Sequence, residues 1–179
     1  MRRFVLWAGI FSAATVSNPA HEPPASVYRD DPRLARLNEF FERFGPASLP
    51  LAPDFLAAAD RNHLDWRLLP SICVVETGGG KTALGNNLFG WDSGRREFAT
   101  LKDGIYFVAS RLAHSRLYKG KDLDELLATY NSLEGYAARV KSVMRLVDST
   151  TPLSARSGVS RPTTPPYGLP RTARLAPAP

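Results

Sequence analysis

Apolar residues recur with the period of an α-helix over most of residues 32–148, and this repeat restricts the fold more than any other feature of the chain. The first such segment ends at Gly45-Pro46, a pair that does not continue a helix. Two later segments begin with a capping side chain that is followed three residues on by an acidic one. The sequence therefore predicts a mainly α domain. Helices are expected at residues 34–44, 54–62, 65–76, 100–112, 122–131 and 136–147, with inward faces that include Leu34, Leu37, Phe40, Phe41, Phe44, Ile105, Val108, Ala109, Leu112, Tyr136, Val140, Val143, Met144 and Val147.

Residues 86–99 are the one stretch of this region that does not fit a helix. They hold turn residues, alternating aromatic side chains and Gly94, which together predict a loop or a small β-hairpin. The segment before them ends in the run 72–75, which is apolar on every side and therefore predicts a central helix. We expect a helical domain with a short loop or β-hairpin insertion directly after Glu76.

The two ends of the chain have a different composition. Residues 1–20 begin with two arginines and an apolar run of the length found in signal peptides, which is too short to span a bilayer comfortably. Residues 21–31 are expected to be a linker, and residues 149–179, with seven prolines and four arginines, a disordered tail. We therefore predict export to the periplasm or the extracellular space, with a buried helix as the alternative for the first segment. A functional alternative for the tail is contact with anionic wall polymers or with a membrane surface.

The positive charge is confined to those ends. The formal net charge is +6, yet residues 4–148 contain 17 basic and 17 acidic side chains. A nucleic-acid-binding domain usually carries a basic face on its folded part, so this distribution argues against a nucleic-acid partner. Cys73 is the only cysteine, so the domain has to be stable without an internal disulfide. Its place in an apolar run argues against a cysteine peptidase that would pair it with His63 or His114.

Glu76 is the strongest candidate for chemistry, because it ends an apolar helical run and stands directly before the glycines at 78–80. Partial burial disfavours the charged form of a carboxyl group, and the negative end of the helix dipole disfavours it further. We therefore expect Glu76 to hold its proton near neutral pH, as a general acid for glycosidic cleavage does. The glycines are expected to end the helix and to leave room for a bulky polymer. The alternative is an exposed glutamate before an ordinary loop.

The sequence from Glu76 onward resembles a signature of bacterial cell-wall hydrolases. Residues 76–82 read ETGGGKT, and residues 86–91 follow at a suitable spacing with NNLFGW. This ordered pattern is similar to that of the N-acetylglucosaminidase family of the lysozyme-like superfamily, whose domain is also described as mannosyl-glycoprotein endo-β-N-acetylglucosaminidase-like. The likeness covers roughly residues 50–148 and implies a lysozyme-like helical domain.

The resemblance also implies roles for individual residues. Glu76 would be the catalytic acid. The residues that would shape the cleft and bind the sugars are Asn87, Phe89, Gly90, Trp91 and Tyr130. For Trp91 two interpretations stay open, an exposed platform for a sugar ring and a half-buried anchor of the loop. For Tyr130 the alternative is a core aromatic residue whose hydroxyl reaches the edge of the core, and Tyr136 is expected to be mainly structural. Gly79 departs from the family, which commonly has an aromatic residue there, and this departure would weaken a sugar contact.

A second acid beside Glu76 is not evident. Asp92 and Glu97 lie in the insertion and could hold a water or stabilise an oxocarbenium ion, but each could equally be a solvated loop charge. If neither acts, the mechanism would resemble that of a lytic transglycosylase or use the N-acetyl group of the substrate. We thus predict an exported peptidoglycan hydrolase of the endo-β-N-acetylglucosaminidase type that needs no metal or other cofactor. The alternatives are a lytic transglycosylase on the same fold and a wall-binding module without turnover.

Overall fold

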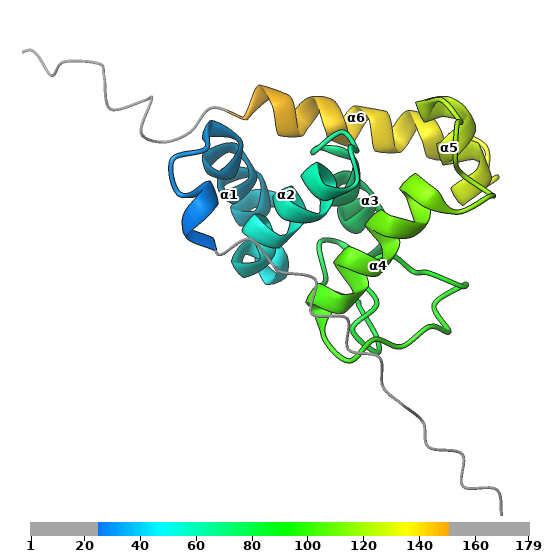
Figure 1. Ribbon diagram of the computed structural model, residues 1–179, viewed down its shortest axis with the longest axis horizontal. Coiled ribbons are helices and arrows are strands. Elements are labelled where there is room, and N and C mark those ends of the chain that lie inside the picture. The colour runs from blue at the N-terminus through cyan, green and yellow to red at the C-terminus, as the bar shows by residue number, and fades with distance from the viewer. Residues whose placement is uncertain (1–24, 151–179) are drawn as a thin grey trace, which may run out of the picture.

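Helices form the regular elements between residues 25 and 150, the part of the chain that the computed structural model describes (Figure 1). The elements are η1 (Ala25–Tyr28), α1 (Pro32–Phe44), η2 (Pro46–Leu51), α2 (Ala52–Arg61), α3 (Leu68–Thr77), α4 (Leu101–His114), α5 (Leu123–Tyr130) and α6 (Tyr136–Ser149), where η marks a 3-10 helix. The prediction of a mainly α domain is confirmed. The segment between α3 and α4 is a loop of successive turns; because residues 25–150 contain no strand, the β-hairpin alternative is not formed.

Side chains that cap the helices explain where two of them begin. Thr100 accepts a hydrogen bond from the amide of Asp103 at the start of α4, and the Asp103 carboxylate accepts one from the amide of Thr100. Asp122 and Glu125 form the same reciprocal pair at the start of α5. Each pair satisfies amides that the first turn leaves without partners, and such a cap stabilises a helix by about 1 kcal/mol. Both starts agree with the sequence prediction.

The two helices before the loop begin at different residues from those expected. α2 starts before Asp54, because Pro53 suits the first turn of a helix and extends it backward. α3 starts after the expected Asp65, whose carboxylate accepts the Arg67 amide at 2.9 Å and closes a separate turn. Pro70 then lies in the first turn of α3, where proline is tolerated.

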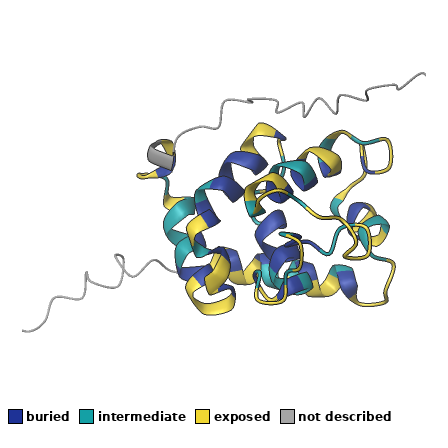
Figure 2. Ribbon diagram, turned by 90° about the horizontal axis from the view of Figure 1, so that it is seen from below, coloured by how far each residue is buried: buried dark blue, intermediate teal, exposed yellow. Residues whose placement is uncertain are grey.

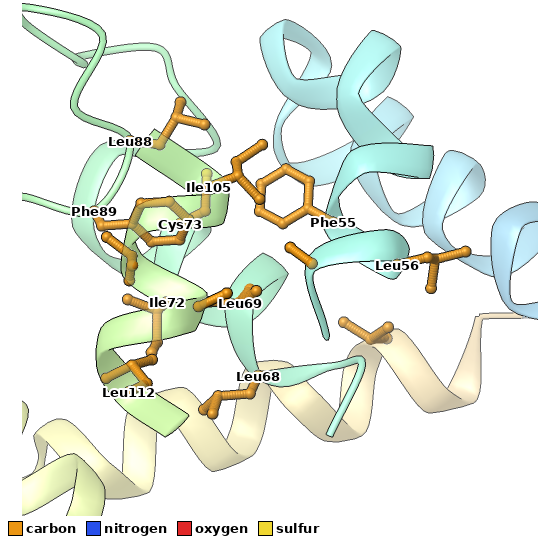
Figure 3. Packing of buried hydrophobic residues seen from close by; sticks show 14 of the residues in the cluster. Phe55, Leu56, Leu68, Leu69, Ile72, Cys73, Leu88, Phe89, Ile105 and Leu112 are labelled. Carbon is orange, nitrogen blue, oxygen red and sulfur yellow. The ribbon is translucent and has the colours of Figure 1, made fainter. Parts of the chain in front are cut away.

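The centre of the fold is α3, which packs along α6 and against α2 (Figure 1). Leu69, Ile72 and Cys73 of this helix are fully buried, while Val74 and Val75, which complete the predicted apolar run, are half-buried. Side chains from α2 and α4 join them in one cluster, together with Leu88 and Phe89 from the loop (Figure 3). The loop is therefore anchored in the core rather than laid over the surface.

The inner sides of the helices are buried and their outer sides are exposed (Figure 2). Phe44 was expected on the inner side but is 40% exposed, since it lies in the last turn of α1, just before the chain turns at Gly45. Its ring still packs on Phe40, with the ring centroids 5.3 Å apart. Leu34 and Val143 are half-buried, and the other residues expected to face inward are buried as predicted.

The beginning of the described range differs from the linker expected at residues 21–31. Ala25–Tyr28 forms η1, and Tyr28 is only 7% exposed. The Tyr28 hydroxyl donates to the Asp60 carboxylate at 3.2 Å, which ties this segment to the end of α2. The folded part of the chain therefore begins before residue 32.

The signal peptide expected at residues 1–20, the first part of the linker and the tail beyond residue 150 lie outside the described residues. Between residues 25 and 150, none of the helices has the length and apolar character needed to cross a membrane.

Candidate active site

Glu76 lies in the last turn of α3, as the sequence predicted. The helix ends because Gly78 adopts a left-handed backbone with a φ angle of 61°, which glycine accepts at little cost. The amide of Gly78 donates to the Val74 carbonyl oxygen at 3.0 Å and closes the helix end. The Glu76 side chain is therefore held where the chain leaves the core, and it is half-buried there.

Thr77 holds the following loop over the end of α3. Its hydroxyl donates to the Leu88 carbonyl oxygen at 2.8 Å and accepts the Gly80 amide at 3.0 Å. Leu88 and Phe89 are also buried in the core, and they bring Gly90 back against Glu76. One local hydroxyl and two apolar anchors thus place this part of the loop beside the carboxyl group.

Gly90 has no side chain and so leaves open space beside the Glu76 carboxyl group. The sequence analysis expected the glycines at 78–80 to leave this space, and that interpretation is corrected. An added Cβ on Gly90 would lie 2.9 Å from Glu76 Oε2. Gly79 instead serves a close backbone contact, because a Cβ there would lie 2.2 Å from the Cα of Gly45. A side chain at position 79 would therefore not fit against Gly45.

Tyr136 on α6 orients the Glu76 carboxyl group. Its hydroxyl donates to Glu76 Oε1 at 2.7 Å, and the residue is 1% exposed. Burial, together with the hydrogen bond to Glu76, raises the pKa of Tyr136 far above its usual value, so the hydroxyl stays protonated and remains a donor. Sequence analysis placed Tyr136 in the core but missed this contact, since 60 positions separate the two residues and no local pattern joins them. That Glu76 itself holds a proton near neutral pH stays a prediction.

A polar hollow of about 580 Å³ opens beside Glu76. Its walls come from the end of α3, the loop after it, and the end of α5 with the turn that follows. The lining residues are Glu76, Gly90, Ser93, Gly94, Thr129, Tyr130, Asn131 and Ser132. Among these described residues Glu76 is the only carboxyl group, and hydroxyls, an amide and backbone provide most of the rest. The hollow suits a polar chain that is hydrogen-bonded along its length and meets one acid.

Tyr130 lines this hollow, as expected, while its hydroxyl holds the loop. The hydroxyl donates to the Phe89 carbonyl oxygen at 2.6 Å. The ring stacks on that of Tyr136, with centroids 6.0 Å apart and 12° between the planes. Burial, and then the charge of Glu76 nearby, raise the pKa of Tyr130 well above its usual value, so this hydroxyl also stays a donor. A contact between Tyr130 and a sugar stays a prediction.

Asn87 and Phe89 shape the loop from within. Both residues are buried, with 3% and 0% of their surface exposed. The Asn87 side-chain amide donates to the carbonyl oxygens of Trp91 and Arg96 at 3.0 and 2.9 Å, and its oxygen accepts the Trp91 amide at 2.9 Å. The contribution of these two residues to a binding site is therefore indirect, through the shape of the loop.

Asn87→Ala is expected to loosen this loop without unfolding the domain. The truncation removes three hydrogen bonds to the backbone of the loop, and we expect the free energy of unfolding to fall by about 2–3 kcal/mol. The Trp91 amide should also exchange with deuterium much faster. Denaturant unfolding and hydrogen exchange measure the two effects. Asn131→Ala is the matched control, since Asn131 lines the hollow but accepts only the Leu133 amide among the bonds the structure describes for its side chain. Equal exchange at Trp91 in both variants would contradict the role of Asn87.

Trp91 is half-buried among aromatic rings, which supports its role as an anchor of the loop. Its ring centroid lies 5.8 Å from that of Phe107, 6.2 Å from that of Tyr118 and 5.9 Å from that of Tyr130. Trp91 also lines a second hollow next to the first. Stacking of a sugar ring on Trp91 stays a prediction.

Neither candidate for a second acid lines the hollow of Glu76. Asp92 is exposed, forms an ion pair with Arg95 at 2.7 Å and lines the neighbouring hollow instead. Glu97 is exposed, and its side chain packs against Gly85. In the part of the chain that the structure describes, one carboxyl group is therefore available for chemistry in the first hollow.

Cys73 is a packing residue. It is fully buried, and burial raises the pKa of its thiol to about 11, so little thiolate forms near neutral pH. Its sulfur lies 3.5 Å from the buried Ser48 hydroxyl. Between residues 25 and 150, no group of three histidine, cysteine, aspartate or glutamate side chains is placed to hold a metal ion.

The fold and the site together define a class of protein: a mainly α domain with one half-buried carboxyl group, oriented by a buried tyrosine, at the edge of a polar cleft. No protein-family model matches the chain, and no curated protein matches it in sequence. A proposal about function therefore rests on the geometry of the site and on the resemblance carried by residues 76–91.

Proposed function

We propose that this protein cleaves β-1,4 bonds in the glycan strands of peptidoglycan, as an endo-β-N-acetylglucosaminidase-like glycoside hydrolase on a lysozyme-like helical domain. The setting of Glu76 carries the proposal. Tyr136 holds one carboxyl oxygen, and the other faces the space left by Gly90 in a polar hollow. The ordered resemblance of residues 76–91 to cell-wall glucosaminidases supports the same substrate. Such a substrate lies outside the cytoplasm, which fits the signal peptide expected at residues 1–20.

Glu76 would act as the general acid. Its protonated oxygen donates to the oxygen of the glycosidic bond while the bond between that oxygen and the sugar C1 breaks. The departing strand keeps the proton, the sugar left behind becomes an oxocarbenium-like ion, and Glu76 becomes a carboxylate. The Tyr136 hydroxyl stays bound to Glu76 Oε1, so it limits rotation of the carboxyl group and leaves Oε2 toward the cleft.

A lytic transglycosylase is the second candidate, and the single carboxyl group of the hollow favours it. In this route the sugar's own 6-hydroxyl attacks C1, and the Glu76 carboxylate takes the hydroxyl proton. The acid is thereby regenerated and a 1,6-anhydro sugar remains. Hydrolysis with one carboxyl group would instead use the N-acetyl group of the substrate to stabilise C1 before water attacks. Neither route needs Asp92 or Glu97, which lie outside the lining of this hollow.

Tyr136→Phe is expected to lower kcat about tenfold with little change in KM, because the loss of one hydrogen bond leaves the Glu76 carboxyl group free to rotate. The phenyl ring keeps the packing of the tyrosine ring. Steady-state rates on soluble glycan oligomers measure the effect. Tyr28→Phe is the matched control, since it also removes a bond from tyrosine to a carboxylate, that of Asp60, but outside the lining of the cleft. A similar small loss in both variants would contradict the orienting role of Tyr136.

Mass spectrometry of purified peptidoglycan, digested with the mature protein, tests the proposed function. Products with a reducing N-acetylglucosamine end would support the glucosaminidase. Anhydro-muramyl ends would support the lytic transglycosylase. No products at all, under conditions in which a known wall hydrolase is active, would contradict both and leave a wall-binding module.

A further inference from the structure

A second hollow, of about 420 Å³, lies next to the one that holds Glu76. The two hollows share Gly90, Ser93 and Tyr130, so a strand bound over Glu76 can continue from one into the other. The remaining walls of the second hollow come from the loop between α3 and α4, from α4 and from the turn after α4. The residues found only in this second lining are Trp91, Asp92, Arg96, Phe107, Arg111 and Tyr118.

Two arginines that pair with no carboxylate in the described part of the chain lie over one aromatic ring in this second hollow. The guanidinium carbons of Arg96 and Arg111 lie 4.7 and 5.6 Å from the ring centroid of Phe107. Both arginines are exposed, and no carboxylate between residues 25 and 150 forms an ion pair with either. Arg95, on the same loop, instead pairs with Asp92 at 2.7 Å, so the one carboxylate of this lining is already neutralised. The hollow therefore has a net positive charge.

Stacking on a ring restricts a guanidinium group and leaves its N–H edge free to bind. That edge matches a carboxylate, which it can bind through two parallel hydrogen bonds. Trp91 and Tyr118 add apolar wall area beside the arginines, as ligand sites commonly have around a few polar groups. The arrangement suits a ligand that combines a sugar or short peptide with a negative group.

We propose that the second hollow binds a carboxylate group of the substrate strand, next to the sugar whose bond is cut. This inference rests on the proposed function and narrows the substrate class. Peptidoglycan strands carry carboxylates either on the free lactyl group of muramic acid or, where it is attached, on the stem peptide. A strand of N-acetylglucosamine alone has none. Arg96 and Arg111 would thus select peptidoglycan over neutral glycans with the same β-1,4 bond.

Calorimetric binding to three oligomers tests the inference, with Glu76→Gln as the background so that no ligand is consumed. The ligands are an N-acetylglucosamine oligomer, a glycan-strand oligomer stripped of peptide, and the same oligomer with its stem peptides. We expect the double variant Arg96→Gln/Arg111→Gln to lower affinity for a carboxylate-bearing oligomer by about tenfold or more. Affinity for the neutral oligomer should stay the same. The control is Arg29→Gln/Arg116→Gln, which removes the same charge from two exposed positions outside both hollows.

The outcomes distinguish the two sources of the carboxylate, and they distinguish failure of this inference from failure of the proposed function. A loss on the stripped oligomer alone assigns the hollow to the lactyl group, and a loss on the peptide-bearing oligomer alone assigns it to the stem peptide. A loss on both charged oligomers means that the hollow accepts either carboxylate. An equal loss on all three ligands, an equal loss in the control, or no loss would overturn the inference. If wild-type protein digests peptidoglycan but the arginine effect is absent, only this inference fails. If the arginine effect is present but no digestion occurs, only the proposed catalytic function fails.

Discussion

Glu76→Gln is expected to lower the rate of glycan-strand cleavage by about 10²- to 10⁴-fold, the contribution typical of a general acid. The amide keeps the shape of the side chain, and its oxygen can still accept the Tyr136 hydroxyl, but it cannot donate an acidic proton to the glycosidic oxygen. The fold and the affinity for cell-wall material should therefore survive. Release of soluble fragments from purified peptidoglycan measures the rate, and sedimentation with the same material measures binding.

The control for this variant is Glu97→Gln, which neutralises an exposed carboxyl group that lines neither hollow. Its rate should stay within a factor of about two of the wild-type rate, since surface substitutions of this kind have small effects. A Glu76→Gln rate within tenfold of wild type, with both variants equally stable, would remove Glu76 from the mechanism.

Gly79→Ala is expected to destabilise the domain by about 3–5 kcal/mol, because two costs add at this position. The backbone of Gly79 is left-handed, with a φ angle of 68°, which an alanine adopts only with strain. The new methyl group would also lie 2.2 Å from the Cα of Gly45, so η2 and the glycine turn would have to separate. The hydrogen bond that the Ser48 hydroxyl donates to the Gly79 carbonyl oxygen at 2.8 Å would then be lost as well.

Gly120→Ala is the matched control for this stability prediction. Gly120 also has a left-handed backbone, with a φ angle of 80°, but no atom lies within 4 Å of its added Cβ. It should cost about 1 kcal/mol, from backbone strain alone. Urea unfolding gives the free energy of unfolding of both variants, and the difference between them is the cost of the steric clash with Gly45. Equal destabilisation by Gly79→Ala and Gly120→Ala would contradict a close backbone contact between Gly79 and Gly45.

Local sequence signals sufficed for the helices and for the position of Glu76. The apolar periodicity and the capping pair of Thr100 and Asp103 act within one or two turns, so they are visible in a short window. The all-round apolar run of α3 gave its central place for the same reason. The start of α3 was missed because Asp65 can cap either a helix or a separate turn, and the sequence does not distinguish the two.

The arrangement around Glu76 depends on contacts between distant segments, which no local pattern encodes. Gly79 looks like a residue that clears space until Gly45 is placed against it. Tyr136 looks like a core residue because periodicity shows which face points inward but not which polar atom its hydroxyl meets. Arg96 and Arg111 were not singled out at all, since only the fold of the loop against α4 brings both to Phe107.

The most direct test of the central claim is the structure of the Glu76→Gln protein bound to a glycan-strand oligomer. Our account predicts that the strand lies in the hollow beside Gly90, with one glycosidic oxygen about 3 Å from the side-chain amide of residue 76, the distance required for proton transfer. The sugar on one side of that bond should extend toward Trp91. A strand bound on another face, with residue 76 touching Tyr136 alone, would contradict the assignment of this cleft as the active site.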